Sequence, residues 1–367
     1  LIATAVLSAC GGGDGGGGVF LPVPPPAPAP SPAPAPAPIA AGTRATVALL
    51  ETTDLHFNVR SYDYFKLAED KSYGYERTAT LIAAARKEFA NTLLFDNGDT
   101  IQGTALADYE ALVSRIPCTQ PLSMYKAMNA AGFDAGTLGN HEFNYGLDFL
   151  NQAIGGGLDV EGVDGTKKCA GPNFPLVLAN VQSVKSGKPL LAPYTIVNKS
   201  FTATAPDGSR VTVPLKVGVI GFTTPGIMNW DKRYLEGKLR TEGAVEAATR
   251  YIPELRAKGA DIVVALQHGG LDAAAYTPTM ENPGLHLSKV PGIDALLMGH
   301  QHGVFPDRGA SPGFKQPGVD NAAGTVNGVP AVMPSSWGKA LGVIKLELSW
   351  DGKAWTIDKS KTAVEAR

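Results

Sequence analysis

Short apolar runs alternate with segments of helical periodicity from about residue 43 onward. Ten runs rich in β-branched residues predict strands: 46–51, 92–96, 135–138, 176–180, 215–222, 262–267, 295–298, 331–334, 342–349 and 354–358. Four segments predict helices: 76–90, 121–131, 147–154 and 244–258. This alternation predicts an α/β layered domain over residues 43–367. An Asp-Gly turn joins the last two strands, which we place in a second sheet or at an antiparallel edge.

Two low-complexity segments precede this domain. Residues 11–18 are nearly all glycine, and residues 22–38 are mostly alternating proline and alanine. The first composition is typical of a flexible coil and the second of a polyproline II rod, and neither can bury a core. We therefore expect residues 11–42 to form a disordered spacer that holds the domain away from a membrane surface.

The first ten residues resemble the end of a bacterial lipoprotein signal peptide. The chain begins with Leu rather than Met, so we expect that its start is missing. Residues 1–7 are apolar but too few to span a bilayer. Leu-Ser-Ala-Cys at 7–10 resembles a lipoprotein processing site, which would make Cys10 the lipidated residue. A plain secretory signal is the alternative, and both interpretations predict export to the periplasm or cell envelope.

Composition and charge narrow the classes of function. The 367 residues are 44% hydrophobic and 18% charged, which allows a large core. The net charge of −2 gives no basic excess, so we expect no binding to a nucleic acid duplex. If Cys10 carries lipid, Cys118 and Cys169 remain as a candidate disulfide in an oxidising compartment, or as two unpaired loop thiols.

Polar side chains with metal-binding chemistry follow five of the predicted strands. They are, in chain order, Asp54 and His56, Asp99, Asn140 and His141, His268, and His300 and His302. Open α/β sheets gather ligand-binding groups at the carboxyl ends of their strands, so we expect these side chains to converge on one rim. Each motif alone is a weak signal, but the whole set, each after an apolar run, predicts a site for two metal ions.

The types of side chain indicate which metals would bind. Carboxylate and carboxamide oxygens together with imidazole nitrogens suit Zn, Mn, Fe or Co better than Ca or Mg. Asp99 could bridge the two ions. Asp54 and His56, like His300 and His302, are two residues apart and can point into one cavity from extended backbone. A pair of divalent ions is the arrangement that cleaves phosphate esters.

Longer stretches around these residues resemble a known family. Gly-Asn-His-Glu-Phe-Asn at 139–144 is similar to the signature of the nucleotidase branch of the calcineurin-like metallophosphoesterases. Within that branch, the stretches 51–56, 96–103, 139–148, 221–225 and 329–334 look like the periplasmic 2',3'-cyclic-nucleotide 2'-phosphodiesterase/3'-nucleotidase family. Asn144 favours that family, because the 5'-nucleotidases usually have Asp at this place. The resemblance covers residues 43–367.

The resemblance implies a fold and an activity. The fold is a four-layer α/β/β/α sandwich of the metallophosphatase type. The substrate is a small nucleotide, with hydrolysis of 2',3'-cyclic nucleotides to 3'-nucleotides and then to nucleoside plus phosphate. A 5'-nucleotidase or UDP-sugar hydrolase, or a lipid-anchored binding module without turnover, is the alternative. Family members continue into a second, nucleotide-recognition domain, which we expect to be absent here.

The resemblance also assigns roles to individual residues. Asp54, His56, Asp99 and His302 would hold one metal, and Asp99, Asn140, His268 and His300 the other. His141 would stay off the metals and act on the phosphate, as a catalytic residue beside Asn140. Because Asn144 cannot hold an imidazolium as Asp would, we expect His141 to act as a neutral hydrogen-bond donor. Tyr62, Asp63 and Tyr64 either line the mouth of the site or pack.

Overall fold

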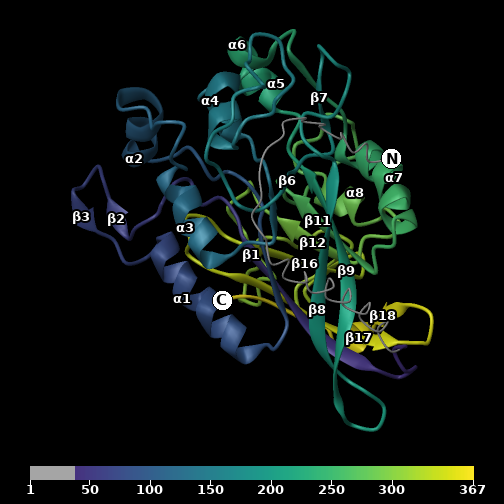
Figure 1. Ribbon diagram of the computed structural model, residues 1–367. Helices are drawn as coiled ribbons and strands as arrows, with labels where there is room; N and C mark the ends of the chain where they lie inside the picture. Colours follow the sequence, from purple (N-terminus) through teal and green to yellow (C-terminus); the bar gives the residue numbers. More distant parts are fainter. Residues whose placement is uncertain (1–37) are drawn as a thin grey trace, which may run out of the picture. The chain divides into compact units, whose positions relative to one another are not determined.

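Two β-sheets that pack face to face form the centre of the protein (Figure 1). The structure, a computed structural model, describes residues 38–367. The first sheet has the order β17–β1–β4–β5–β6, formed by Gly342–Trp350, Arg44–Thr52, Thr92–Asp96, Ala135–Thr137 and Leu176–Val177. Its strands are parallel except for β17, which also pairs with β18 (Trp355–Ile357) and β19 (Ala363–Ala366).

The second sheet carries the remaining long strands. Its order is β8–β9–β11–β12–β16, formed by Tyr194–Thr204, Arg210–Phe222, Ile262–Gln267, Ala295–Met298 and Val329–Pro334. Its outer edge is extended by β13 (Val304–Phe305), β15 (Thr325–Val326) and β14 (Val319–Asp320). One residue pair, Arg44 with Thr204, links β1 to β8, so the two sheets form a continuous set of 15 strands.

Apolar side chains on alternate positions of the strands separate the protein into layers. Val47 and Leu49 of β1 point between the sheets, where they meet Val264 of β11. Ala48 and Leu50 of the same strand point to the opposite face. That face is covered by α1 (Tyr75–Glu88), α3 (Ser123–Ala131) and α4 (Leu147–Ala153), whereas α7 (Ala244–Ala257) and α8 (Gly284–Leu287) cover the outer face of the second sheet. The predicted α/β/β/α sandwich is therefore confirmed.

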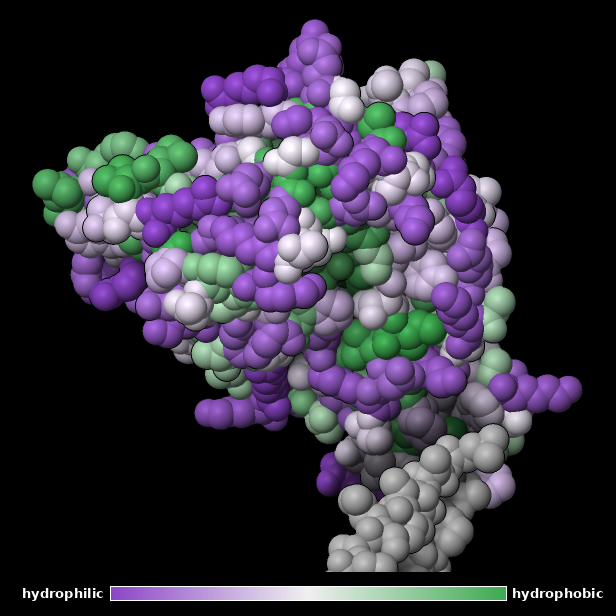
Figure 2. All heavy atoms as spheres, turned by 45° about the horizontal axis from the view of Figure 1, so that its top comes forward, coloured by the Kyte–Doolittle hydropathy of each residue, from purple (hydrophilic) through white to green (hydrophobic). Residues whose placement is uncertain are grey.

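Shorter elements surround the open ends of the strands (Figure 1). They are the hairpin β2 (Tyr62–Asp63) and β3 (Ala68–Glu69), the pair β7 (Val181–Ser183) and β10 (Leu239–Thr241), and helices α2 (Ala105–Asp108), α5 (Ile227–Trp230) and α6 (Lys232–Leu235). Exposed apolar residues gather on the hairpin and on the π-helical turn Tyr109–Val113 that follows α2. Figure 2 shows a hydrophobic patch formed by these residues at the left of the view.

The main departures from the sequence prediction lie in one long hairpin. Strand β8 was not predicted, and β9 begins at Arg210 rather than at residue 215. Most residues of β8 are exposed or half-buried, and the first residues of β9 alternate between exposed and more buried positions, so both segments lack the continuous apolar run of a fully buried strand. The predicted helices match α1, α3, α4 and α7 with shifts of up to two residues at their ends.

The amino-terminal predictions fall almost entirely outside the described residues. Cys10, the signal segment 1–10 and most of the spacer 11–42 lie there. Residues Ile39–Arg367 form one compact unit. Within the described part of the chain, none of the helices has the length and apolar character needed to cross a membrane.

Candidate metal centre

The predicted ligands meet at the carboxyl ends of strands from both sheets. Asp54 and His56 follow β1, Asp99 follows β4, and Asn140 follows β5 in the first sheet. His268 follows β11, and His300 and His302 follow β12 in the second. Since the two sheets pack face to face, these loops come together although they are up to about 250 residues apart in sequence.

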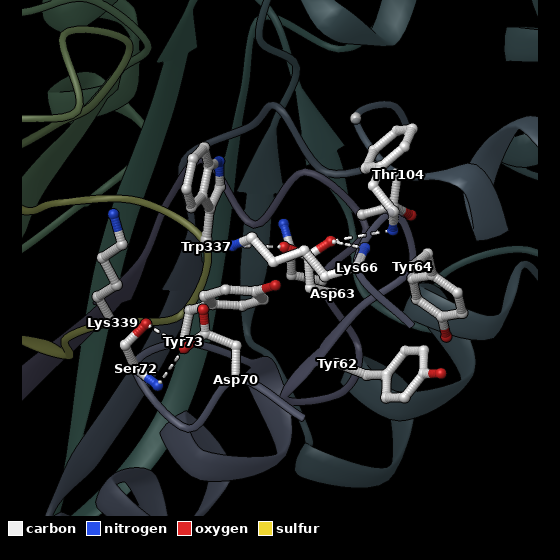
Figure 3. Close-up of a pocket in the computed structure, with 13 residues that line it drawn as sticks. Tyr62, Asp63, Tyr64, Lys66, Asp70, Ser72, Tyr73, Thr104, Trp337 and Lys339 are labelled. Atoms are coloured by element: carbon white, nitrogen blue, oxygen red, sulfur yellow. Dashed lines mark hydrogen bonds and ion pairs between the residues drawn. The ribbon is translucent and has the colours of Figure 1, made fainter. Parts of the chain in front are cut away.

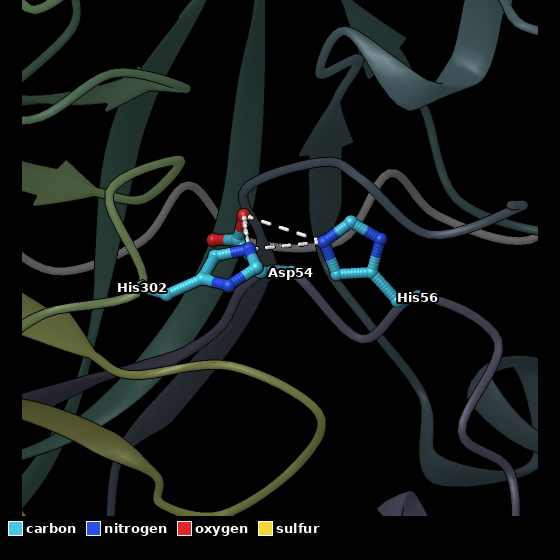
Figure 4. Close-up of side chains that lie close together, drawn as sticks. All are labelled: Asp54, His56 and His302. Carbon is cyan, nitrogen blue, oxygen red and sulfur yellow. Dashed lines mark hydrogen bonds and ion pairs between the residues drawn. The ribbon is translucent and has the colours of Figure 1, made fainter. Parts of the chain in front are cut away.

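The first group of side chains joins Asp54, His56 and His302 (Figure 4). The Nε2 atom of His302 lies 3.2 Å from Oδ1 of Asp54 and 3.0 Å from Nε2 of His56. The Nε2 atom of His56 is 3.9 Å from the same carboxylate oxygen. Two imidazoles and one carboxylate therefore converge on a single point, as they do around a transition-metal ion.

The second group is centred on Asp99 and His268. The Nε2 atom of His268 lies 3.0 Å from Oδ2 of Asp99 and 3.2 Å from Oδ1 of Asn140. Asp99, His268 and His300 each offer a ligand atom within 4.8 Å of the others. Oδ2 of Asp99 is also 3.7 Å from Nε2 of His56, so this one oxygen faces both groups. The protein thus has adjacent His/Asp groups able to bind metal.

Hydrogen bonds behind the ligands set which imidazole nitrogen faces the centre. The Nδ1 atom of His56 lies 3.0 Å from the carbonyl oxygen of Gln102, and that of His268 lies 2.7 Å from the carbonyl oxygen of Asn97. A carbonyl can only accept, so each Nδ1 carries a proton and each Nε2 is the nitrogen that faces the centre. This is the tautomer that a metal ligand needs.

The electrostatics of the centre favour a bound cation. Burial lowers the pKa of His56 and of His300, which keeps both imidazoles in the neutral, ligating form. Burial also opposes the charged form of His268, but the nearby Asp99 and Asp54 carboxylates outweigh it and raise the pKa of His268 to about 10. Two fully buried carboxylates therefore hold a strongly negative field where the two groups meet.

Most of the predicted ligands have a strained backbone. Asp54, His56, Asp99, His300 and His302 have φ between 45° and 69°, in the left-handed region. Residues with side chains rarely adopt this conformation, at a cost of roughly 1–3 kcal/mol each. Such strain is typical of functional sites, because the surrounding structure must hold it in place.

Glycines allow the ligand loops to approach closely. A Cβ atom on Gly139 would lie 2.2 Å from Oδ1 of Asp99 and 2.7 Å from Cε1 of His268. A Cβ atom on Gly299 would lie 2.7 Å from Oδ2 of Asp54. Any larger residue at either position would displace a ligand.

The buried carboxylate of Glu142 organises the loop that carries Asp99. It accepts hydrogen bonds from the backbone N–H groups of Gly139 (2.6 Å), Asp99 (2.9 Å), Thr100 (2.6 Å) and Ile101 (3.2 Å). These contacts tie the loop after β5 to the loop after β4. The sequence prediction did not assign a role to Glu142, although the residue lies inside the 139–144 signature.

His141 lies at the edge of the centre, with its side chain one-third exposed. Its Nε2 atom is 3.9 Å from Oδ2 of Asp99, and its Nδ1 atom is 2.6 Å from Oε1 of Gln102. Asn144 contacts Asp231 instead: its Nδ2 donates to both carboxylate oxygens, at 3.1 and 3.0 Å. Gln102 and Asp231 are partners that the sequence prediction missed, because these contacts depend on where separate loops meet.

Other residues near the centre were also missed. Nε2 of His300 lies 2.7 Å from a carboxylate oxygen of Glu281, and the indole of Trp230 stacks on the His300 ring. The indole of Trp337 lies edge-on to the ring of His302.

Away from the centre, the candidate pair Cys118 and Cys169 forms a disulfide, with the two Cα atoms 4.5 Å apart.

Comparison with known proteins agrees with this geometry. The model of the family described as calcineurin-like phosphoesterase matches residues 48–304, which include all the candidate ligands. The chain belongs to this family. The 2',3'-cyclic-nucleotide 2'-phosphodiesterase/3'-nucleotidase of Salmonella typhimurium is 45% identical over 332 residues, which are 90% of this chain and 47% of that protein. A snake venom 5'-nucleotidase from Gloydius brevicauda is 30% identical over 340 residues, covering 88% of this chain and 48% of that protein.

A solved relative shares the fold of this family member. The crystal structure of the calcineurin-like phosphoesterase YfkN from Bacillus subtilis has 41% sequence identity and a TM-score of 0.76. The match covers 88% of this chain and 91% of that one. The chain spans about half the length of the two curated relatives from Salmonella and Gloydius.

Proposed function

We propose that this chain is a dinuclear-metal phosphoesterase that converts 2',3'-cyclic nucleotides to 3'-nucleotides and then to nucleoside plus phosphate. The observation that carries the proposal is the position of Asp99, whose Oδ2 lies 3.0 Å from Nε2 of His268 and 3.7 Å from Nε2 of His56. One carboxylate oxygen between two imidazole groups is the arrangement of a bridging ligand. The 45% identity to a protein of the proposed activity supports the choice of substrate.

The side chains present fit two ions of Zn, Mn, Fe or Co. Asp54, His56, Asp99 and His302 would hold one, and Asp99, Asn140, His268 and His300 the other. Bound there, the pair would supply hydroxide at neutral pH and neutralise charge on the phosphoryl oxygens. The protein orients His56 and His268 through the backbone carbonyls of Gln102 and Asn97, and it fixes the backbone of the Asp99 loop through Glu142.

His141 is placed to protonate the leaving alkoxide. Its Nδ1 atom donates to Oε1 of Gln102, so Nε2 carries a proton only in the imidazolium form. The acid that we propose is therefore the imidazolium form of His141. Positioned proton transfer of this kind contributes about 10²- to 10⁴-fold in rate.

A substrate panel tests the proposed activity. Purified protein with added Mn²⁺ is assayed on 2',3'-cyclic AMP, 3'-AMP and 5'-AMP, with a chelator as the metal-free control. We expect turnover of the first two and its loss on chelation. Preferred hydrolysis of 5'-AMP would instead support a 5'-nucleotidase, and turnover that persists in chelator would refute a metal centre.

The His141→Ala variant tests the acid. We expect turnover of 2',3'-cyclic AMP to fall by about 10²- to 10⁴-fold while the metal content stays the same, because His141 is not among the proposed ligands. A variant with unchanged turnover would remove His141 from the mechanism.

We also propose export and a lipid anchor at Cys10. The processing-site resemblance at residues 7–10 supports this, and the disulfide between Cys118 and Cys169 suits an oxidising compartment. Labelling of the full-length protein with radioactive palmitate in a bacterial host, with Cys10→Ala as the control, tests the anchor. Equal labelling of both proteins would refute it.

A further inference from the structure

An aromatic pocket of about 450 Å³ lies near the candidate metal centre. Figure 3 shows the side chains that line it. Its aromatic lining comes from three separate segments of chain that no ligand motif includes. These side chains are Tyr62, Tyr64, Phe65, Tyr73 and Trp337. A volume of this size lies within the range of small-molecule sites, which bind through apolar and aromatic walls with a few polar groups.

The pocket shares a wall with the metal centre. The ring of Trp337 lies edge-on to the ring of His302, with centroids 6.2 Å apart. The backbone N–H of Trp337 donates to the carbonyl oxygen of Asp54 at 2.7 Å. On the other side, Gly103 of the pocket is so close to His56 that a Cβ atom would lie 2.6 Å from the His56 Cβ. The pocket therefore begins one side chain away from three predicted ligands.

The aromatic rings form two sides of the pocket. Trp337 and Tyr73 lie on one side, with ring centroids 5.9 Å apart, and Tyr62 and Tyr64 lie on the other, 5.1 Å apart (Figure 3). Trp337 is 38% exposed although it is among the largest apolar side chains. The exposed surface of the Trp337 indole can stack against a flat ring, and stacking of this kind contributes about 1–3 kcal/mol per base.

Charged side chains of both signs line the pocket. Nζ of Lys339 lies 4.3 Å from the ring of Trp337, and Lys66 extends across the pocket with its side chain 74% exposed. Two carboxylates, Asp63 and Asp70, balance these cations, and Asp63 forms a 3.0 Å ion pair with Lys66. The walls thus combine flat apolar rings with polar groups that can meet the edge of a heterocycle.

We propose that this pocket binds the nucleobase of the substrate by stacking on Trp337 while the phosphate lies at the metal centre. The inference rests on the proposed phosphoesterase function, and it places base recognition within this chain. In a nucleotide, one ribose separates the phosphate from the base, which matches the single side-chain layer between the predicted ligand His302 and the pocket.

The test compares Trp337→Ala with Tyr109→Ala, which removes an exposed aromatic ring outside the pocket. Substrates are 2',3'-cyclic AMP and ribose 2',3'-cyclic phosphate, which has no base. We expect Trp337→Ala to raise KM for 2',3'-cyclic AMP by about 5- to 150-fold, with kcat retained and the base-free substrate unaffected. Trp337→Phe should restore most of the binding. Equal behaviour of the two alanine variants, or an equal loss on both substrates, would overturn the proposal.

A binding measurement separates this inference from the catalytic one. Adenosine binding to the chelator-treated protein is followed by saturation-transfer NMR, which requires no turnover. We expect a signal in the wild type and in Tyr109→Ala, and its loss in Trp337→Ala. If the protein binds adenosine through Trp337 but has no phosphoesterase activity, the proposal for the pocket stands and only the proposed function is refuted. Adenosine binding that survives in Trp337→Ala would refute the pocket, whatever the activity.

Discussion

Five of the seven predicted ligands adopt a left-handed backbone conformation, and their neighbours must hold them there. The strongest local restraint is Glu142, which gathers four backbone N–H groups from the loops that carry Asp99 and Gly139. It is fully buried, so these donors have no water to replace it. At the scale of single residues, the geometry of the centre depends on such contacts as much as on the ligands.

Replacement of Glu142 by Gln tests this restraint. A Gln side chain presents an N–H₂ group to N–H donors, so at least one buried donor loses its partner. We expect the variant to be less stable by about 1–3 kcal/mol and to bind metal about 10- to 100-fold more weakly. Thermal unfolding and metal titration measure both effects, with the exposed Glu161→Gln as the control. A Glu142→Gln variant that matched its control would contradict the account.

Replacement of Gly139 by Ala tests the close approach of the ligand loops. The added Cβ atom would lie 2.2 Å from Oδ1 of Asp99, so the carboxylate must move. We expect a loss of about 1–3 kcal/mol in stability together with weaker metal binding. Gly313→Ala is the matched control, because a Cβ atom there meets nothing within 4 Å. Unchanged metal affinity in Gly139→Ala would show that Asp99 is not where the structure places it.

The elements of the fold differ in how well the sequence predicts them. Strands β4, β11 and β12 match the predicted ranges residue for residue, because each is a short run buried on both faces. Strand β8 has mostly exposed or half-buried residues, so its signal is weak and it was not predicted. Pairing with β9 along eleven residues, rather than burial of its own side chains, defines it.

The candidate ligands that lie together in the structure stand out in the sequence for the same reason. Each follows a strong strand, and parallel strands in a sheet end at one rim. Gln102, Asp231 and Trp337 belong to the site only because loops from distant parts of the chain meet there. The periodicity of the sequence and the spacing of its motifs do not show which distant loops contact one another.

The disulfide between Cys118 and Cys169 connects two irregular segments outside the sheets. It closes a loop of 51 residues, and a cross-link of this span contributes about 2–4 kcal/mol by restricting the unfolded chain. We therefore expect a reducing agent to lower the unfolding temperature of the wild type. The double variant Cys118→Ser, Cys169→Ser should unfold at that lower temperature with or without the agent. Identical melting of the wild type under both conditions would contradict the prediction.

At the scale of the whole molecule, the packing of the two sheets determines where the site forms. Asp54, His56 and Asp99 come from the first sheet and His268 and His302 from the second. The apolar layer between the sheets fixes the distance between these two sets. A chain of about half the length of its relatives from Salmonella and Gloydius thus contains the entire set of candidate ligands and an aromatic pocket next to them.

A crystal structure of the protein soaked with Mn²⁺, recorded at a wavelength where manganese scatters anomalously, would show whether two ions bind around Asp99. We expect two anomalous peaks, one on each side of Asp99, each about 2.0–2.2 Å from an Asp oxygen or a His nitrogen of the candidate ligands. A single peak, peaks elsewhere on the protein, or two peaks that do not share Asp99 would contradict it.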